Sequence, residues 1–69
     1  MRTLGYTFIS SDGYPKGNAV PTAEEARHIG RFNGEGNLYA ICVNEFNATF
    51  LLLVDRKTEA KWEGDEKGG

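Results

Sequence analysis

The stretch LYAICVNEFNATFLLLV, residues 38 to 54, constrains the fold more than any other part of the chain. It holds most of the aliphatic residues, and outside the segment 44–47 almost every position is apolar. A strand that is buried on one face alternates apolar and polar residues, and this stretch does not. We therefore expect two neighbouring strands, at about 38–43 and 48–55, that carry apolar side chains on both faces of a sheet.

The pairing of these two strands decides which side chains share a face. A four-residue loop at 44–47 would place Val43 opposite Ala48 and fix the register. One face then carries the bulkier set, namely Tyr39, Ile41, Val43, Phe50, Leu52 and Val54. The other face carries Leu38, Ala40, Cys42, Thr49, Leu51 and Leu53.

A single helix can cover only one of these faces, and the bulkier face has the stronger claim on it. The second face would then be covered by another molecule, because large exposed apolar patches usually mark an interface. That contact is either a symmetric dimer interface or a target-binding surface. The residues predicted for it are Leu38, Ala40, Cys42, Leu51 and Leu53.

The one clear helix lies between the N-terminal strand and the apolar stretch. Thr22 followed by Glu25 has the spacing of a capping box, and Asn33-Gly34 supplies a stop, so the helix is expected from about Ala23 to Phe32. Its buried side would consist mainly of small residues, namely Ala23, Ala26, Ile29, Gly30 and Asn33. Its polar side would carry Glu24, Arg27, His28 and Arg31.

The remaining segments complete an α+β fold. Residues 3–9 alternate as a half-buried strand. Residues 10–21 are rich in turn formers and are expected as a loop, with a short ribbon as the alternative. A turn at 57–60 would return the chain as a short fourth strand holding Trp62. We predict one helix packed on an antiparallel sheet of three to four strands, in the order β-α-β-β with that short fourth strand last. Residues 1–63 would form a single domain, and residues 64–69, which end in Gly68-Gly69, a loose tail.

Composition narrows the classes of function. Eight Lys and Arg against ten Asp and Glu give a net charge of −2, so no excess of positive charge attracts nucleic acid non-specifically. The single cysteine, Cys42, allows no internal disulfide and no multi-cysteine zinc site. No segment has the pattern of a signal peptide or of a membrane span, so a cytoplasmic protein is expected.

Catalytic and ligand signatures are weak throughout. His28 has Glu24 one helical turn before it, but no nucleophile accompanies the pair, and a solvated surface pair is the favoured interpretation. Cys42 is interpreted as a packed side chain rather than a reactive thiol. The sequence therefore predicts no enzyme activity, no cofactor and no metal site.

The order of a strand, the capped EEARHI helix and a hairpin that runs through FLLLVDRKTEAKW resembles that of small phage-encoded proteins, including some anti-CRISPR inhibitors. The resemblance covers residues 3 to 62. It implies a compact α+β protein that acts in the cytoplasm of a bacterial host. Such a protein would block a host protein complex by occupying a surface, without cofactor or turnover.

Two functional hypotheses follow. The first is a non-enzymatic protein-binding module of the phage inhibitor type, with a host protein or a second copy of the chain as partner. The alternative is a small nucleic-acid-binding accessory protein that uses a basic and aromatic side formed by Arg27, Arg31, Lys61 and Trp62. Salt-tolerant capture of a protein would favour the first hypothesis, and steeply salt-dependent binding to oligonucleotides the second.

Overall fold

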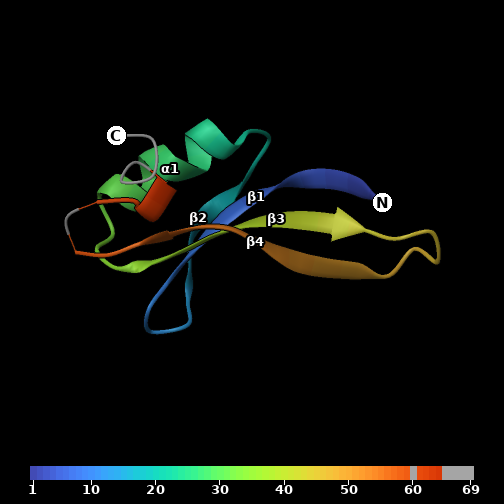
Figure 1. Cartoon of the computed structure of the whole chain (residues 1–69). Coiled ribbons are helices and arrows are strands. Elements are labelled where there is room, and N and C mark those ends of the chain that lie inside the picture. Colours follow the sequence, from blue (N-terminus) through green and yellow to red (C-terminus); the bar gives the residue numbers. More distant parts are fainter. Residues whose placement is uncertain (60, 65–69) are drawn as a thin grey trace.

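The computed structural model describes residues 1–59 and 61–64 and shows one helix packed on a four-stranded antiparallel sheet (Figure 1). The elements follow the order β1 (Arg2–Ser10), β2 (Pro15–Val20), α1 (Ala23–Arg31), β3 (Gly36–Val43) and β4 (Thr49–Lys57). The predicted α+β class, with one helix on an antiparallel sheet, is confirmed. Of the predicted tail, 65–69 lie outside the described residues, and so does the Gly68-Gly69 end.

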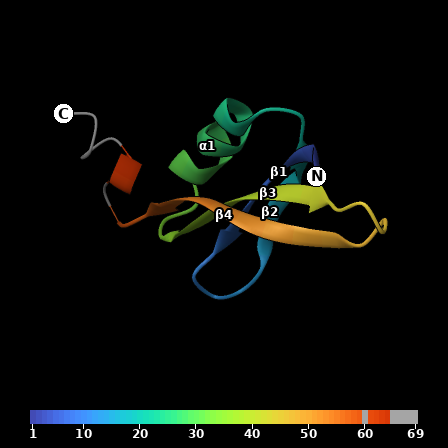
Figure 2. The ribbon, with the colours of Figure 1, turned by 45° about the vertical axis from the view of Figure 1, so that its right-hand side comes forward.

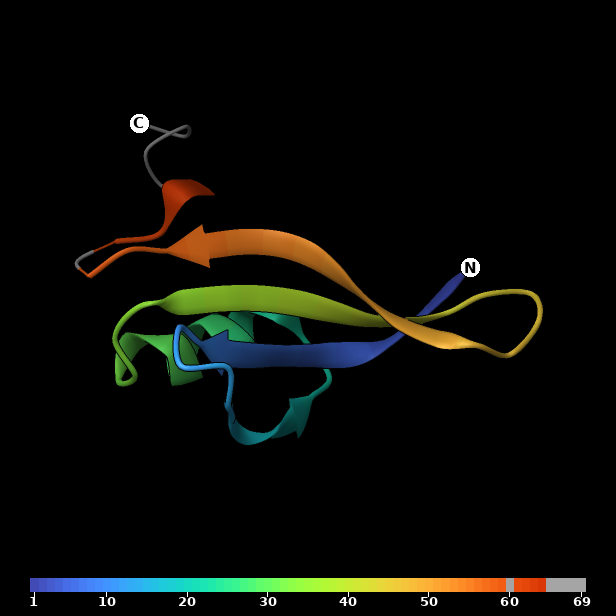
Figure 3. The same cartoon turned by 90° about the horizontal axis from the view of Figure 1, so that it is seen from below.

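The strands are arranged in the order β2-β1-β3-β4, so β2 and β4 form the two edges of the sheet (Figure 3). β1 pairs with β3, with Phe8 opposite Leu38 and Tyr6 opposite Ala40. The helix packs on β1, β2 and β3 and leaves β4 largely outside its cover. Figure 2 shows the β3–β4 hairpin extending beyond the end of α1.

The predicted order of elements needs two corrections. The segment 10–21, expected as a loop with a short ribbon as the alternative, contains the strand β2. This strand pairs with β1 after a tight turn closed by a hydrogen bond from the Ser10 amide to the Tyr14 carbonyl. Pro15 and Gly17 hid this strand, since both residues are rare in the interior of a sheet. The expected fourth strand at Trp62 is instead a single bridge between Lys57 and Trp62.

The helix forms where the sequence places it. The Thr22 side chain accepts a hydrogen bond from the Glu25 amide at 3.2 Å, which satisfies one of the free amides of the first turn. Phe32 caps the C-terminal end, and the chain turns away at Gly34, whose φ of 68° suits a residue without a side chain. The predicted bounds and the Thr22 cap are confirmed.

The core lies between α1 and the sheet and is built around two aromatic rings. Phe8 and Trp62 meet edge to face, with ring centroids 5.8 Å apart, and pack with the fully buried Ala26 and Leu38. Gly30 lies directly above the two rings, because a Cβ added there would approach Trp62 Cζ2 to 2.7 Å and Phe8 Cδ2 to 3.0 Å. The small residues of the helix therefore make room for large residues of the sheet and of the segment after it.

The β3–β4 hairpin has a shorter loop than the sequence predicted, and this shifts its register by one residue. Asn44 closes on Ala48 through a hydrogen bond from the Asn44 amide to the Ala48 carbonyl at 3.0 Å. Asn47 adopts a left-handed φ of 61°, and the Asn44 side-chain oxygen accepts hydrogen bonds from the amides of Phe46 and Ala48. A three-residue loop with a left-handed third residue is a common hairpin type. Val43 consequently lies opposite Thr49 rather than Ala48.

Gly30→Ala should destabilise the protein by about 1–3 kcal/mol, because the new methyl group meets two buried aromatic rings. A loss of stability would be informative, because in an exposed helix the same substitution raises the free energy of unfolding by roughly 1 kcal/mol. Urea denaturation followed by circular dichroism measures the effect. His28→Ala, at an exposed position of the same helix, serves as the control and should change the free energy of unfolding by less than about 0.5 kcal/mol. A Gly30→Ala variant as stable as wild type would contradict the packing described here.

Candidate protein-binding surface

The two faces of β3 are used in the opposite way to the prediction, whereas the leucines of β4 predicted for the uncovered side, Leu51 and Leu53, do lie there. Leu38 and Cys42 are fully buried and Ala40 nearly so, on the face that α1 covers. The interface residues Leu38, Ala40 and Cys42 are therefore internal to this chain, and their expected exposure was wrong. The cause is the depth of the core, because the small flank of α1 leaves space for Phe8 and Trp62 to pack against the Leu38 side of β3.

The uncovered side of the sheet keeps two residues of the predicted interface. Leu51 lies opposite Ile41 and Leu53 opposite Tyr39, and both leucines are about half exposed. We call this side, defined by Tyr39, Ile41, Leu51 and Leu53, the open face. Figure 3 views the sheet from this side, with α1 behind the strands. No helix or strand of the described residues covers the open face.

A second apolar feature runs along β4 itself. Five consecutive side chains of this edge strand are 37–49% exposed, namely Phe50, Leu51, Leu52, Leu53 and Val54. We call them the apolar edge. A register shift between the pairs of Leu38 and Tyr39 makes Val54 an extra residue, so the straight part of the strand ends at Leu53.

Along β4 the usual relation between polarity and burial is reversed, with apolar residues exposed and two polar residues buried. The apolar residues of its first half are exposed, whereas Asp55 and Lys57 in its second half are 8% and 7% exposed. Lys57 donates a hydrogen bond from Nζ to the Gly34 carbonyl at 2.8 Å, which ties the end of β4 to the loop after α1. The polar half of β4 is thus fixed to the core, and the apolar half projects from it.

Asp55 is the centre of the contacts that fix β4. Its Oδ2 lies 2.7 Å from Nη1 of Arg27, and its Oδ1 accepts hydrogen bonds from the amides of Arg56 and Gly64 at 2.8 and 3.0 Å. The Arg27 guanidinium also lies over the Trp62 ring, 5.1 Å from the centroid. Burial by itself would raise the pKa of Asp55, but these donors together hold it below its ordinary value.

Arg27 and Trp62, two of the four residues predicted for the alternative nucleic-acid side, make contacts inside the protein. Arg27, expected on the solvent side of the helix, is half-buried and paired with Asp55, and Trp62 is buried beneath it. Arg31 and Lys61 are exposed. A hollow of about 270 Å³ beside Arg27 and Arg31 is also lined by Glu24 and His28, so its charge is mixed. Phosphate contacts favour a basic surface, which this side does not offer.

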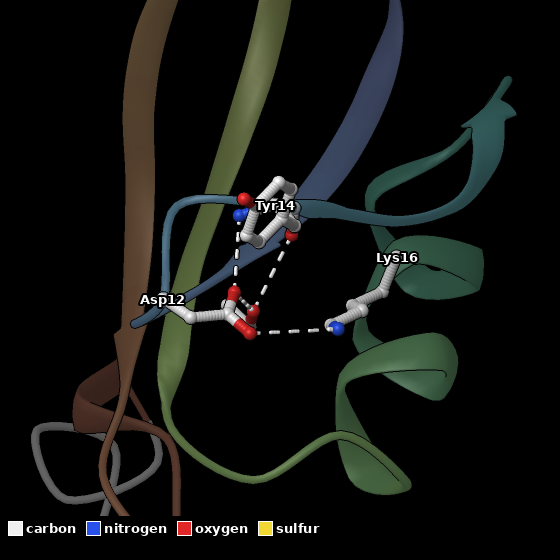
Figure 4. Close-up of polar contacts among 4 residues, drawn as sticks. Asp12, Tyr14 and Lys16 are labelled. Carbon is white, nitrogen blue, oxygen red and sulfur yellow. Dashed lines mark hydrogen bonds and ion pairs between the residues drawn. The ribbon is translucent and has the colours of Figure 1, made fainter.

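The turn before β2 carries a compact polar cluster. Asp12 Oδ1 accepts hydrogen bonds from the Ser10 hydroxyl and, at 3.0 Å, from the Tyr14 amide, while Lys16 Nζ lies 3.8 Å from Asp12 Oδ2 (Figure 4). The Ser10 hydrogen bond first, and the Tyr14 amide second, lower the pKa of Asp12. All these contacts lie within one turn, so their evident role is to shape the β1–β2 connection.

The two residues considered as catalytic candidates, His28 and Cys42, lie at the surface and in the core respectively. His28 is exposed and meets the Phe32 ring edge to face at 5.3 Å, and Cys42 is a buried free thiol beside the Thr3 hydroxyl. Within residues 1–59 and 61–64, no group of three or more His, Cys, Asp or Glu side chains could hold a metal ion. No helix in the described part of the chain is long and apolar enough to cross a membrane.

Comparisons with known proteins give no information about function, so inferences about function depend on the surface of the protein. No family model matches the chain, and neither a curated protein nor a solved structure is significantly similar to it.

Sequence reasoning missed three exposed residues, Phe50, Leu52 and Val54, because it expected the helix to cover the face that carries them. The signal was nevertheless present. FLLLV does not alternate, and α1 is too narrow to reach across four strands, so an apolar run in the last strand was bound to lie partly outside. Knowing that β4 is an edge strand would have required the topology.

Asp55→Asn should lower the free energy of unfolding at pH 7 by about 2–4 kcal/mol, because it leaves Arg27 without its charge partner in a half-buried site. The pKa of Asp55 is lower in the folded state, so its stabilising effect is complete above the unfolded pKa of about 3.9 and is lost as the pH falls through the folded value. Urea denaturation between about pH 3 and pH 7 should therefore show that acidification lowers the free energy of unfolding less for Asp55→Asn than for wild type.

Asp12→Asn provides the matched control for this experiment. Asp12 also has a lowered pKa but lies in solvent, so its substitution should leave most of the wild-type loss of stability at low pH in place. If the free energy of unfolding falls by the same amount at low pH in Asp55→Asn and in wild type, the Arg27–Asp55 pair does not stabilise the fold.

Proposed function

We propose that this protein is a non-enzymatic protein-binding module that uses the open face as its contact surface. The observation that carries the proposal is the exposure of Leu51 and Leu53 beside Ile41 and Tyr39, on a side of the sheet that no described element covers. Contiguous exposed apolar surface on a small protein usually marks an interaction site. A sheet face of this kind suits the apolar surface of another protein.

The surroundings of the open face agree with a specific contact rather than general adhesion. Thr7, Asn37 and Arg56 lie on the same side of the sheet by register, next to Tyr39 and Leu53. An apolar centre with a polar and charged margin is the usual anatomy of a protein interface. Tyr39 adds an aromatic side chain with a hydroxyl group, and tyrosine is among the residues enriched at such contacts.

The order of elements that resembles phage-encoded inhibitors favours a host protein complex as the partner. Under this proposal the protein acts by occupying a surface, which needs a stable contact and no turnover. The structure offers less support for the nucleic-acid alternative, because Arg27 is paired with Asp55 and lies over the buried Trp62 ring.

Leu53→Lys tests the proposed contact surface. A charged side chain at the centre of an apolar contact loses its hydration, so capture of the partner should fall at least about tenfold. Bacterial lysate is passed over immobilised wild-type and variant protein, and the retained proteins are quantified by mass spectrometry at low and high salt.

Phe32→Lys is the matched control, since it places the same charge on an exposed apolar residue at the end of α1, away from the open face. Proteins retained by wild type and Phe32→Lys but lost with Leu53→Lys would support the proposal. Equal retention by all three proteins, or capture that high salt abolishes, would count against it. Circular dichroism of each variant confirms that the fold is intact.

A further inference from the structure

The two edges of the sheet differ in how they are protected. β2 carries Pro15, which lacks an amide hydrogen, together with Lys16 and the left-handed Gly17. Proline, lysine and local irregularity are the usual devices that prevent one sheet edge from pairing with another. β4 has none of these from Thr49 to Leu53, where every residue after the threonine is apolar. Within the described residues, this edge is limited by the extra residue Val54, by the charged residues after it and by the bridge between Lys57 and Trp62.

The hydrogen bond that closes the hairpin shows which backbone groups of β4 are free. The Asn44 amide donates to the Ala48 carbonyl, and hydrogen-bonded and non-bonded pairs alternate along antiparallel strands. In the observed register, the backbone groups of Phe50 and Leu52 therefore point toward β3. Those of Thr49, Leu51 and Leu53 point outward, which gives three amides and three carbonyls along the free edge.

We infer that β4 pairs antiparallel with β4 of a second copy of this chain, with Leu51 of one copy directly opposite Leu51 of the other. This inference names a partner for β4 and rests on the proposed function only in treating the apolar surface as a contact surface. In this register Thr49 lies opposite Leu53 of the second copy, so all three outward-facing residues form hydrogen-bonded pairs. A shift by two residues in either direction would leave one of the three outward-facing residues without an outward-facing residue opposite it.

The same register is self-complementary in its side chains and charges. Phe50 lies opposite Leu52 of the second copy on the helix side, so the residues of the apolar edge cover one another and no like charges meet within the paired segment. Exposed Glu45 and Arg56 lie at opposite ends of the strand, and antiparallel pairing brings each to the end that carries the other. Such a peripheral charge pair orients the two copies more than it strengthens their contact.

Pairing in this way produces one continuous eight-stranded sheet with both helices on the same side. The two open faces then adjoin, and Leu51 and Leu53 of both copies form one larger apolar surface. The dimer therefore enlarges the surface that the proposed function requires. Contacts made by one short strand of each copy belong to the small and weak class of interfaces, so a dissociation constant on the order of tens of micromolar is expected.

The experiment uses purified full-length protein and charge complementarity at Leu51. Sedimentation velocity from about 5 μM to 1 mM should show wild type shifting from monomer to dimer. Leu51→Lys and Leu51→Glu should each remain monomeric, because two like charges would lie directly opposite each other. An equimolar mixture of the two variants should recover the dimer.

Wild type that stays monomeric across this range would overturn the inference, and so would a mixture that fails to associate. Leu51→Pro separates edge pairing from contact between open faces, because it removes an outward amide without removing a hydrogen bond to β3. It should weaken the dimer roughly 30-fold through the loss of two hydrogen bonds, whereas Leu51→Ala, which keeps the amide, should weaken it less. A dimer unaffected by Leu51→Pro would show that the copies meet through another surface.

Leu53→Lys distinguishes failure of this inference from failure of the proposed function. Its lysine lies opposite Thr49 of the second copy, so the dimer should persist while capture of a partner protein is lost. Loss of the dimer in Leu53→Lys would contradict the register. Capture by wild type without any dimer would overturn the pairing and leave the proposed function standing.

Discussion

The fold depends on the close approach of α1 to the Phe8–Trp62 pair. Ala26 and Gly30 bring the helix backbone near the sheet, and the two rings fill the space that larger helical residues would otherwise occupy. Phe8 comes from the first strand and Trp62 from the segment after the last strand, so this contact joins distant parts of the chain. In a domain of this size, which buries only about 60% of its surface, one aromatic pair contributes a large share of the core.

Because the core is concentrated at one end, the two halves of β4 have different roles. Asp55 and Lys57 hold the second half through Arg27, the Gly64 amide and the Gly34 carbonyl. The first half extends beyond α1 and keeps its apolar side chains near solvent. The polar contacts thus fix the base of an apolar strand that projects beyond the helix, without requiring the helix to cover its length.

The sequence predicted the α+β class, the helix from Thr22 onward and the existence of both long strands, because each rests on a local pattern. It failed where the outcome depended on geometry between segments. The Asn44 side chain stabilises a three-residue loop, and that single residue of difference pairs Phe50 and Leu52 with the Leu38 side of β3 rather than with the Tyr39 side. β2 was hidden by Pro15 and Gly17, whose propensities are those of a turn. Of the predicted interface, Leu51 and Leu53 are exposed, whereas Leu38, Ala40 and Cys42 are buried, since nothing local indicated that Trp62 would return to the core.

The burial of Cys42 gives the protein an internal reporter of local opening. This thiol is fully enclosed near the C-terminal end of β3, beside Thr3 and opposite Phe50. A thiol reagent can reach it only when the hairpin separates from its neighbours, because enclosed cysteines are otherwise inert. The rate of its modification therefore measures how often this hairpin opens, independently of global unfolding. Any molecule that binds across β4 would slow that reaction, even if it makes no contact with the sulfur.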